Sequence, residues 1–167
     1  MIVVTGGAGF IGSAFVWKLN AEGIDDIVIV DRLDRSDKWK NLVKRRYSDY
    51  IHKDEFMKMI SADDVPFNVR ALIHLGACTS TTERDADYLL ENNCHYACRL
   101  AEWSLKHDVR FIYASSAATY GDGSFGFSDD DSLTVGLRPI NMYGYSKQLL
   151  DLWVLRHQAH QRIAGVK

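Results

Sequence analysis

Tyr143 and Lys147 stand four residues apart in the segment NMYGYSK, where an apolar pattern typical of a helix begins. Residues at this spacing are neighbours on one helical face. An ammonium group beside a phenol favours the phenolate and lowers a pKa that is about 10 in unstructured peptides. The pair therefore suits a general base that takes the proton of an alcohol while hydride leaves the adjacent carbon.

A second hydroxyl that could orient such an alcohol follows an apolar segment. We expect residues 109–116 to form a strand that ends in Ser115 and Ser116. Open α/β sheets bind their ligands at the carboxyl ends of strands. Either serine suits the role on local grounds alone.

Four glycines near the N-terminus form a turn between an expected strand and an expected helix. Gly7, Gly9 and Gly12 fit the G-x-G-x-x-G spacing, and Gly6 with Gly9 and Gly12 fits the G-x-x-G-x-x-G variant. Such a turn lets a diphosphate approach the free amides of the helix N-terminus. Asp31 ends the next expected strand, where a carboxylate accepts hydrogen bonds from the adenosine ribose. Together these positions predict dinucleotide binding.

The residues around Asp31 bear on which dinucleotide binds. A carboxylate favours a free ribose 2′-hydroxyl, as in NAD. Arg32, Arg35 and Lys38 follow closely, however, and such cations pair well with a 2′-phosphate. The charges favour NADP, and NAD stays open.

The expected elements alternate between strand and helix. Short apolar runs predict strands at residues 2–5, 26–31, 70–77 and 109–116. Helical patterns lie at residues 11–23, 54–60, 88–106 and 143–160. The polar segment 32–53 is expected to be a solvated loop, and residues 163–166 look like the start of another strand. This order predicts an α/β fold, a doubly wound parallel sheet with helices on both faces.

Composition excludes several classes of function. The 167 residues are 47% hydrophobic and 25% charged, with a net charge of −2. No basic face predicts nucleic-acid binding, and no apolar run is long enough to span a membrane. Cys78, Cys94 and Cys98 lack the spacing of a zinc site or a disulfide framework, so we expect no metal and a reducing cytoplasm.

The segments VTGGAGFIGS, HLGACTSTTERD, ENN, YASSAATYG and NMYGYSK together resemble the extended short-chain dehydrogenase/reductase family of nucleotide-sugar enzymes, over essentially the whole chain. GACTSTTE resembles, in particular, members that epimerise an ADP-linked heptose for lipopolysaccharide. The resemblance implies a Rossmann fold and an NADP-dependent epimerase that oxidises carbon 6 of the heptose and reduces it again from the other face.

The resemblance also implies the site residues. Ser116 is the substrate-orienting serine, and Tyr143 and Lys147 serve both catalysis and cofactor binding. The implied cofactor contacts are Gly6, Gly7, Gly9, Phe10, Ile11, Gly12, Asp31, Arg32, Lys38, Lys53, Leu75, Gly76, Ala77, Cys78, Thr79 and Asn92. Residues 1–167 correspond to the family's cofactor domain, without its C-terminal substrate domain and second catalytic base. A homo-oligomer paired through helices is also implied.

Two alternatives stay open. One is another nucleotide-sugar epimerase or a 4,6-dehydratase, although dehydration calls for an acidic pair that the SSAAT segment after residue 114 does not offer. The other is a non-catalytic dinucleotide-binding module. Replacing Tyr143 by phenylalanine separates an enzyme from such a module.

Overall fold

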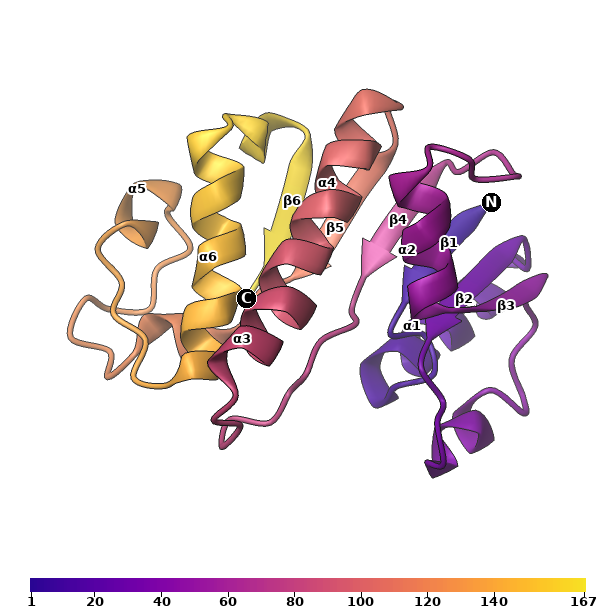
Figure 1. The fold of residues 1–167 in the computed structure, drawn as a ribbon, viewed down its shortest axis with the longest axis horizontal. Helices are drawn as coiled ribbons and strands as arrows, with labels where there is room; N and C mark the ends of the chain where they lie inside the picture. The colour runs from indigo at the N-terminus through magenta and orange to yellow at the C-terminus, as the bar shows by residue number, and fades with distance from the viewer. The chain divides into compact units, whose positions relative to one another are not determined.

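The computed structural model describes residues 1–167 and contains one six-stranded sheet with the order β3-β2-β1-β4-β5-β6 (Figure 1). The strands are β1 (Ile2–Thr5), β2 (Ile27–Asp31), β3 (Asp49–His52), β4 (Ala71–His74), β5 (Arg110–Ala114) and β6 (Ile163–Val166). Strand β1 pairs in parallel with both β2 and β4, and β2 with β3. The chain winds outward from β1 in both directions. Because crossovers between parallel strands are right-handed, this order confirms the predicted doubly wound α/β fold.

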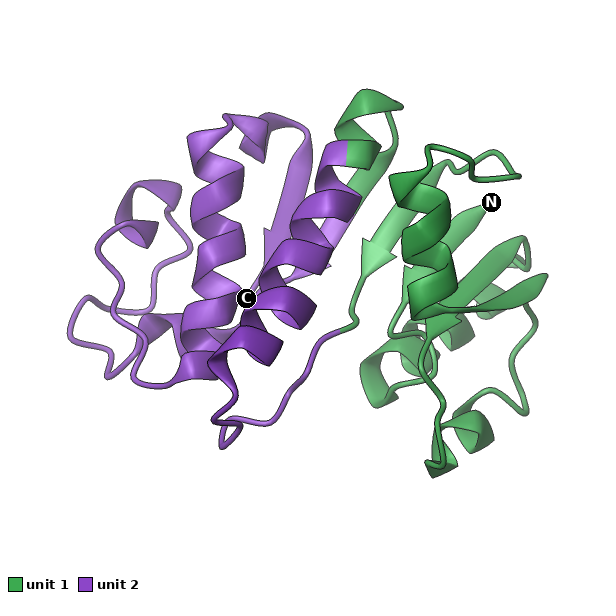
Figure 2. Cartoon of the chain, in the orientation of Figure 1, with its two compact units in different colours: residues 1–76, 103–111 green, residues 77–102, 112–167 purple.

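The chain divides into two compact units, which Figure 2 colours separately. The first comprises Met1–Gly76 and Trp103–Phe111. It holds β1 to β4, helices α1 (Phe10–Ala21) and α2 (Lys53–Ser61), and the short 3₁₀ helix η1 (Asp37–Asn41). Its strands β1 and β2 are buried throughout, as expected of parallel strands covered on both faces.

The second unit comprises Ala77–Glu102 and Ile112–Lys167. A continuous helical rod runs through α3 (Ala86–Leu89), a π-helical segment η2 (Leu90–His95) and α4 (Tyr96–Lys106), whose last turn belongs to the first unit. After β5 come η3 (Ala117–Tyr120), α5 (Asp131–Thr134), α6 (Met142–Arg156) and η4 (Ala159–Gln161) before β6. Residues 163–166 therefore form the expected strand.

The expectation of a plain loop over residues 32–53 was wrong. The segment contains η1 and the edge strand β3, whose sequence DYIH buries only Ile51 fully. An edge strand of this kind has no continuous apolar run, so its sequence pattern resembles that of a loop. Other bounds moved by a few residues, and the last long helix ends at Arg156 instead of near His160.

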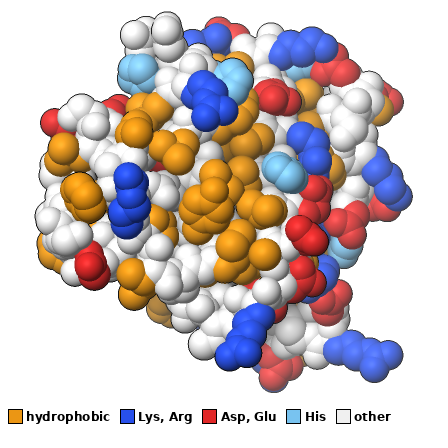
Figure 3. Space-filling view, turned by 60° about the vertical axis from the view of Figure 1, so that its left-hand side comes forward, with side chains coloured by type: hydrophobic (Ala, Val, Ile, Leu, Met, Phe, Trp, Pro, Cys, Tyr) orange, Lys and Arg blue, Asp and Glu red, His pale blue; other side chains and the backbone are white.

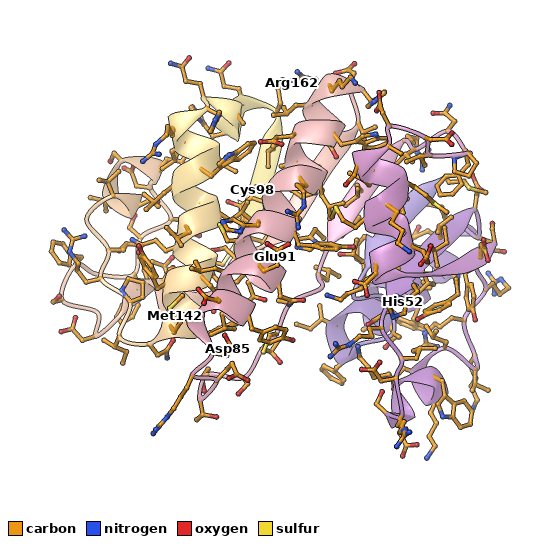
Figure 4. The ribbon with its side chains drawn as sticks, viewed as in Figure 1. His52, Asp85, Glu91, Cys98, Met142 and Arg162 are labelled. Atoms are coloured by element: carbon orange, nitrogen blue, oxygen red, sulfur yellow. The ribbon has the colours of Figure 1, made fainter.

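The long helical rod begins earlier than its apolar pattern indicates. Asp85 caps α3 by accepting a hydrogen bond from the amide of Tyr88 at 2.9 Å. Glu91, labelled in Figure 4, lies within the π-helical segment. It forms ion pairs with His95 and Arg99 further along the helix. None of the helices combines the length and apolarity needed to cross a bilayer.

Candidate functional site

The glycine turn joins the carboxyl ends of β1 and β4 within the first unit. Gly6 has a φ of +68°, and a Cβ there would lie 2.6 Å from the amide nitrogen of Gly76. Only glycine satisfies both the left-handed backbone and this close approach. The Thr5 hydroxyl accepts a hydrogen bond from the Gly76 amide at 3.3 Å. The turn is therefore held in place by the neighbouring strand end.

Helix α1 begins directly after this turn without a side-chain cap. Gly9 occupies the N-cap position, and no side chain accepts from the first turn. Phe10 and Ile11 are 88% and 68% exposed. Uncapped amides at a helix N-terminus attract anions because the helix dipole adds to their hydrogen-bonding capacity. These residues fit a dinucleotide diphosphate.

Asp31 is tied to the glycine turn and to Lys38. Its side chain is 6% exposed and accepts hydrogen bonds from the amide of Ala8 at 2.9 Å and the amide of Arg32 at 2.7 Å. The Lys38 ammonium lies 2.5 Å from the same carboxylate. The charge of Asp31 is thus compensated by a cation of the chain itself. Asn41, which the sequence reasoning missed, donates to the Ala8 carbonyl at 2.8 Å.

Arg32 and Lys53 lie near the same strand end. Asp31 pairs in register with His52, so Lys53, the first residue of α2, follows at the neighbouring strand end. The Arg32 guanidinium is exposed and pairs with Asp34 at 2.8 Å. The first unit therefore brings together the residues predicted for the adenosine end. Leu75 and Gly76, which follow β4, complete its share of the predicted contacts.

In the second unit, α6 carries the predicted base. Asn141 caps the helix by accepting from the amide of Gly144 at 2.8 Å. Tyr143 is half-buried and Lys147 is only 2% exposed. Burial lowers the pKa of Lys147 to about 8, while the charges of Asp151 and Cys94 act in the opposite direction. The protonation state of this lysine therefore changes close to neutral pH.

The first turn of α6 packs against the turn that contains Ser116. A Cβ on Gly144 would lie 2.6 Å from the carbonyl oxygen of Ala118, which follows Ser116 in η3. The Ser116 hydroxyl oxygen accepts from the amide of Ala118 at 3.1 Å and keeps its own hydrogen to donate. The close backbone contact places the Ser116 turn beside the turn that carries Tyr143.

The two serines at the end of β5 differ in their surroundings. Ser115 is 9% exposed and its hydroxyl donates to the Asp151 carboxylate at 2.6 Å. Ser116 is half-buried. Because successive residues of an extended chain point to opposite sides, only one of the two can serve a ligand on a given side. This difference supports Ser116 as the site serine.

The π-helical segment contributes a residue that the sequence reasoning passed over. Asn93, not Asn92, is fully buried, and its amide group pairs with both backbone groups of Cys78, at 2.8 Å and 3.0 Å. It also donates to the Ser146 hydroxyl at 3.1 Å. Asn93 thereby links the segment after β4 to α6, and its neighbour Asn92 donates to it. A π turn inside a helix often marks a functional position, but its wider spacing leaves no mark in the residue pattern.

The other predicted contacts of the second unit lie in the segment after β4. Ala77 and Cys78 are half-buried and Thr79 is exposed. The Cys78 backbone, not its thiol, makes the contacts with Asn93. No group of three or more His, Cys, Asp or Glu side chains gathers in a way that could hold a metal ion.

The parallel sheet order and the glycine turn define a Rossmann-type dinucleotide-binding domain. Residues 2–166 match the NAD dependent epimerase/dehydratase family, and the chain belongs to that family. The chain is 61% identical over all its 167 residues to an ADP-L-glycero-D-manno-heptose-6-epimerase of Nitratidesulfovibrio vulgaris strain DP4, of which it covers 52%. It is 50% identical over 160 residues to the enzyme of the same name from Fusobacterium nucleatum, covering 95% of this chain and 48% of that protein.

Solved structures agree with these relatives. The crystal structure of the Helicobacter pylori ADP-L-glycero-D-manno-heptose-6-epimerase superimposes with a TM-score of 0.75 at 26% identity, covering 93% of this chain and 50% of that one. The UDP-Glc/GlcNAc 4-epimerase of Campylobacter jejuni gives a TM-score of 0.77 at 26% identity, with 98% and 51% covered. The chain spans about half the length of the curated relatives it matches, 52% and 48%.

Proposed function

We propose that this chain is the cofactor-binding and acid–base part of a nucleotide-sugar epimerase, which interconverts ADP-D-glycero-D-manno-heptose and ADP-L-glycero-D-manno-heptose. The observation that carries the proposal is the contact of Gly144 with Ala118 at the base of α6, which supports a shared role for Ser116, Tyr143 and the buried Lys147. Relatives with this name at 61% and 50% identity support the choice of sugar. The product would serve lipopolysaccharide synthesis.

Each proposed residue has one task. Ser116 donates a hydrogen bond to the oxygen on carbon 6 of the heptose and fixes its position. The charge of Lys147 stabilises the phenolate form of Tyr143, which takes the proton of that hydroxyl as the carbon is oxidised and becomes a phenol. A bound nicotinamide cofactor would supply the hydride acceptor for this oxidation and the hydride donor for the reduction from the opposite face. The net redox change of the sugar is nil.

We propose NADP as the cofactor. The first turn of α1 would hold the diphosphate. Lys38 compensates the charge of Asp31 at 2.5 Å, so the carboxylate repels a 2′-phosphate less than a free carboxylate would. The exposed Arg32 lies next to it and suits bidentate phosphate binding. Lys53, Leu75, Gly76, Ala77, Cys78, Thr79 and Asn92 remain predicted cofactor contacts.

Two further properties belong to the proposal. The three cysteines are free thiols, which supports a reducing cytoplasm as its location. Figure 3 shows hydrophobic side chains grouped on one face of the molecule, and such groups favour association. The second unit exposes Phe125, Phe127, Leu133, Val135, Ile140, Tyr145 and Val166. This supports a homo-oligomer.

The proposal is tested by mixing the NADP-loaded protein with ADP-D-glycero-D-manno-heptose and following the absorbance of reduced nicotinamide. We expect a transient of reduced cofactor that Tyr143→Phe abolishes and Tyr145→Phe, on the exposed side of the same turn, leaves intact. UDP-glucose serves as the competing substrate. Reduction by UDP-glucose alone would assign the chain to a 4-epimerase, and NADP binding without reduction by either sugar would favour a binding module.

A further inference from the structure

A buried acid lies next to the proposed base. Asp151 follows Lys147 by four residues and Tyr143 by eight on α6, so the three share one helical face. Asp151 is 6% exposed and Lys147 is 2% exposed. A buried carboxylate is costly unless its oxygens accept hydrogen bonds, and a buried ammonium is costly unless an opposite charge faces it.

Both oxygens of Asp151 accept from hydroxyls on and just after β5. Tyr113 donates to Oδ1 at 2.7 Å, and Ser115 donates to Oδ2 at 2.6 Å. Burial and the nearby charge of Asp151 raise the pKa of Tyr113, so the phenol stays protonated and remains the donor. The two bonds join the end of β5 to the middle of α6, from two positions that are two residues apart in the sequence.

This junction sets the position of the neighbouring serine. Ser116 follows Ser115 directly and leads into η3, which packs on the first turn of α6. The strand end is therefore fastened to α6 at two levels, by Asp151 at the middle and by Gly144 at the start. A shift of Ser115 along the strand would move Ser116 relative to Tyr143 on the same helix.

Burial raises the pKa of Asp151, while the hydrogen bonds from Ser115 and Tyr113 and the charges of Lys167 and Lys147 lower it. The charged groups that act on Asp151 are Lys147, on the same helix, and Lys167, which follows β6. Asp129, Asp131 and His160 line the same cavity as Asp151. Cys94, from the π-helical segment, is the other group whose charge acts on Lys147, and His95 acts on Cys94. Asp151, one helical turn beyond Lys147, is thus the carboxylate whose charge raises the pKa of the buried ammonium.

Asp151 reaches none of the reacting atoms proposed above. With Tyr113 and Ser115 it lines a cavity of about 350 Å³ in the second unit, and the lining residues of that cavity include none of Ser116, Tyr143 and Lys147. The acid therefore acts through other residues. Its candidate tasks are to fix the serine turn and to supply a charge for the lysine.

We propose that Asp151 is a positioning residue of the epimerase site, which fastens the Ser115–Ser116 strand end to α6 and supplies the fixed negative charge that acts on Lys147. The inference rests on the proposed function for its consequence in catalysis. Its electrostatic half rests only on the burial of Asp151 and Lys147 and on their four-residue spacing along α6, so the two halves are tested separately.

The electrostatic half is tested by NMR titration of isotope-labelled lysine side chains, with the Lys147 signal assigned from Lys147→Met. In Asp151→Asn we expect the pKa of Lys147 to fall by about one unit, because an isosteric amide keeps hydrogen-bonding capacity but removes the charge. Asp122→Asn is the control, since Asp122 accepts from the amide of Ser124 at 2.9 Å, is exposed and does not line the cavity of Asp151. An unchanged Lys147 midpoint in folded Asp151→Asn would overturn this half.

The positioning half is tested with the reduction of NADP by the sugar nucleotide. Ser115→Ala keeps the charge of Asp151 and removes one of its hydrogen bonds. We therefore expect the rate of cofactor reduction to fall about tenfold, a loss typical of one hydrogen bond to a charged group. The pH above neutrality at which the rate declines should stay unchanged. Asp151→Asn should lower the rate and also shift this decline of the rate to lower pH. Should Asp151→Asn not fold, Tyr113→Phe replaces it in the rate measurement.

The outcomes are distinguishable. Full wild-type rates in Ser115→Ala and Tyr113→Phe would overturn the positioning role. Absence of cofactor reduction in the wild-type protein at the full length of its relatives would instead refute the proposed function, while the Lys147 titration would still decide the electrostatic role.

Discussion

The backbone of Gly144 passes so close to Ala118 that a Cβ on the glycine would lie 2.6 Å from the Ala118 carbonyl oxygen. The neighbour is main chain and cannot rotate away. Gly144 lies in the first turn of α6, where alanine would otherwise be the better helix former. The contact, and not the helical propensity, therefore decides what a side chain does at this position.

Gly144→Ala should destabilise the protein by about 1–3 kcal/mol, the usual cost of overpacking, and should reduce cofactor reduction more than cofactor binding. The added methyl group pushes α6 away from the Ser116 turn. Chemical denaturation and NADP titration measure the two effects. An unchanged midpoint of unfolding would show that the turn yields without cost.

Gly6→Ala should destabilise the protein more than the same substitution at another glycine with a left-handed backbone. Gly6 combines a positive φ with a Cβ position 2.6 Å from the Gly76 amide nitrogen, whereas Gly23 has a φ of +76° and open space around it. Gly23→Ala should thus lose only about 1–2 kcal/mol from backbone strain. Gly6→Ala should lose clearly more and bind NADP weakly, as measured by urea unfolding and by calorimetry. Equal losses in the two variants would contradict the close approach.

The rate of cofactor reduction should decline as the pH rises through about 8. Burial lowers the pKa of Lys147 to about 8, so the side chain is mostly protonated below that pH and loses its positive charge above it. The phenolate of Tyr143 loses its stabilising charge in the same range. A pH–rate profile in a constant-ionic-strength buffer measures the limb. A rate that keeps rising well above this pH would contradict the role of the lysine.

Lys38→Ala should weaken NADP binding more than NAD binding. The variant removes the cation that compensates Asp31 at 2.5 Å, and the freed carboxylate then repels a 2′-phosphate. We expect the ratio of the two affinities to shift towards NAD by about tenfold, the equivalent of about 1.4 kcal/mol. Lys40→Ala is the control, because Lys40 pairs with the exposed Asp37 instead. Equal changes for both cofactors would contradict the 2′-phosphate assignment.

The strands that are buried along their whole length could be predicted from the sequence. Strands β1 and β2 are buried at every residue, and their apolar runs were visible at once. Strand β3 was missed because it lies at the sheet edge and alternates with polar residues. The π-helical segment was missed because a wider helical turn needs no special residue types.

Local spacing was also enough to predict the candidate catalytic residues of α6, but not the residues that support them. Tyr143 and Lys147 stand out by their separation of four residues. The partners of Asn93 and Asp151 are distant in sequence: Asn93 contacts Cys78 and Ser146, and Asp151 contacts Tyr113 and Ser115. Only the folded chain brings such groups together, so no motif announces them.

The hydrogen bonds that reach Asp31 from Ala8, Arg32 and Lys38 all come from groups of the chain itself. A carboxylate and loop held by the chain's own bonds lose little conformational entropy on association. Nucleotide recognition at this end of the sheet is preorganised. The ordering that usually weakens loop-based recognition was completed when the chain folded.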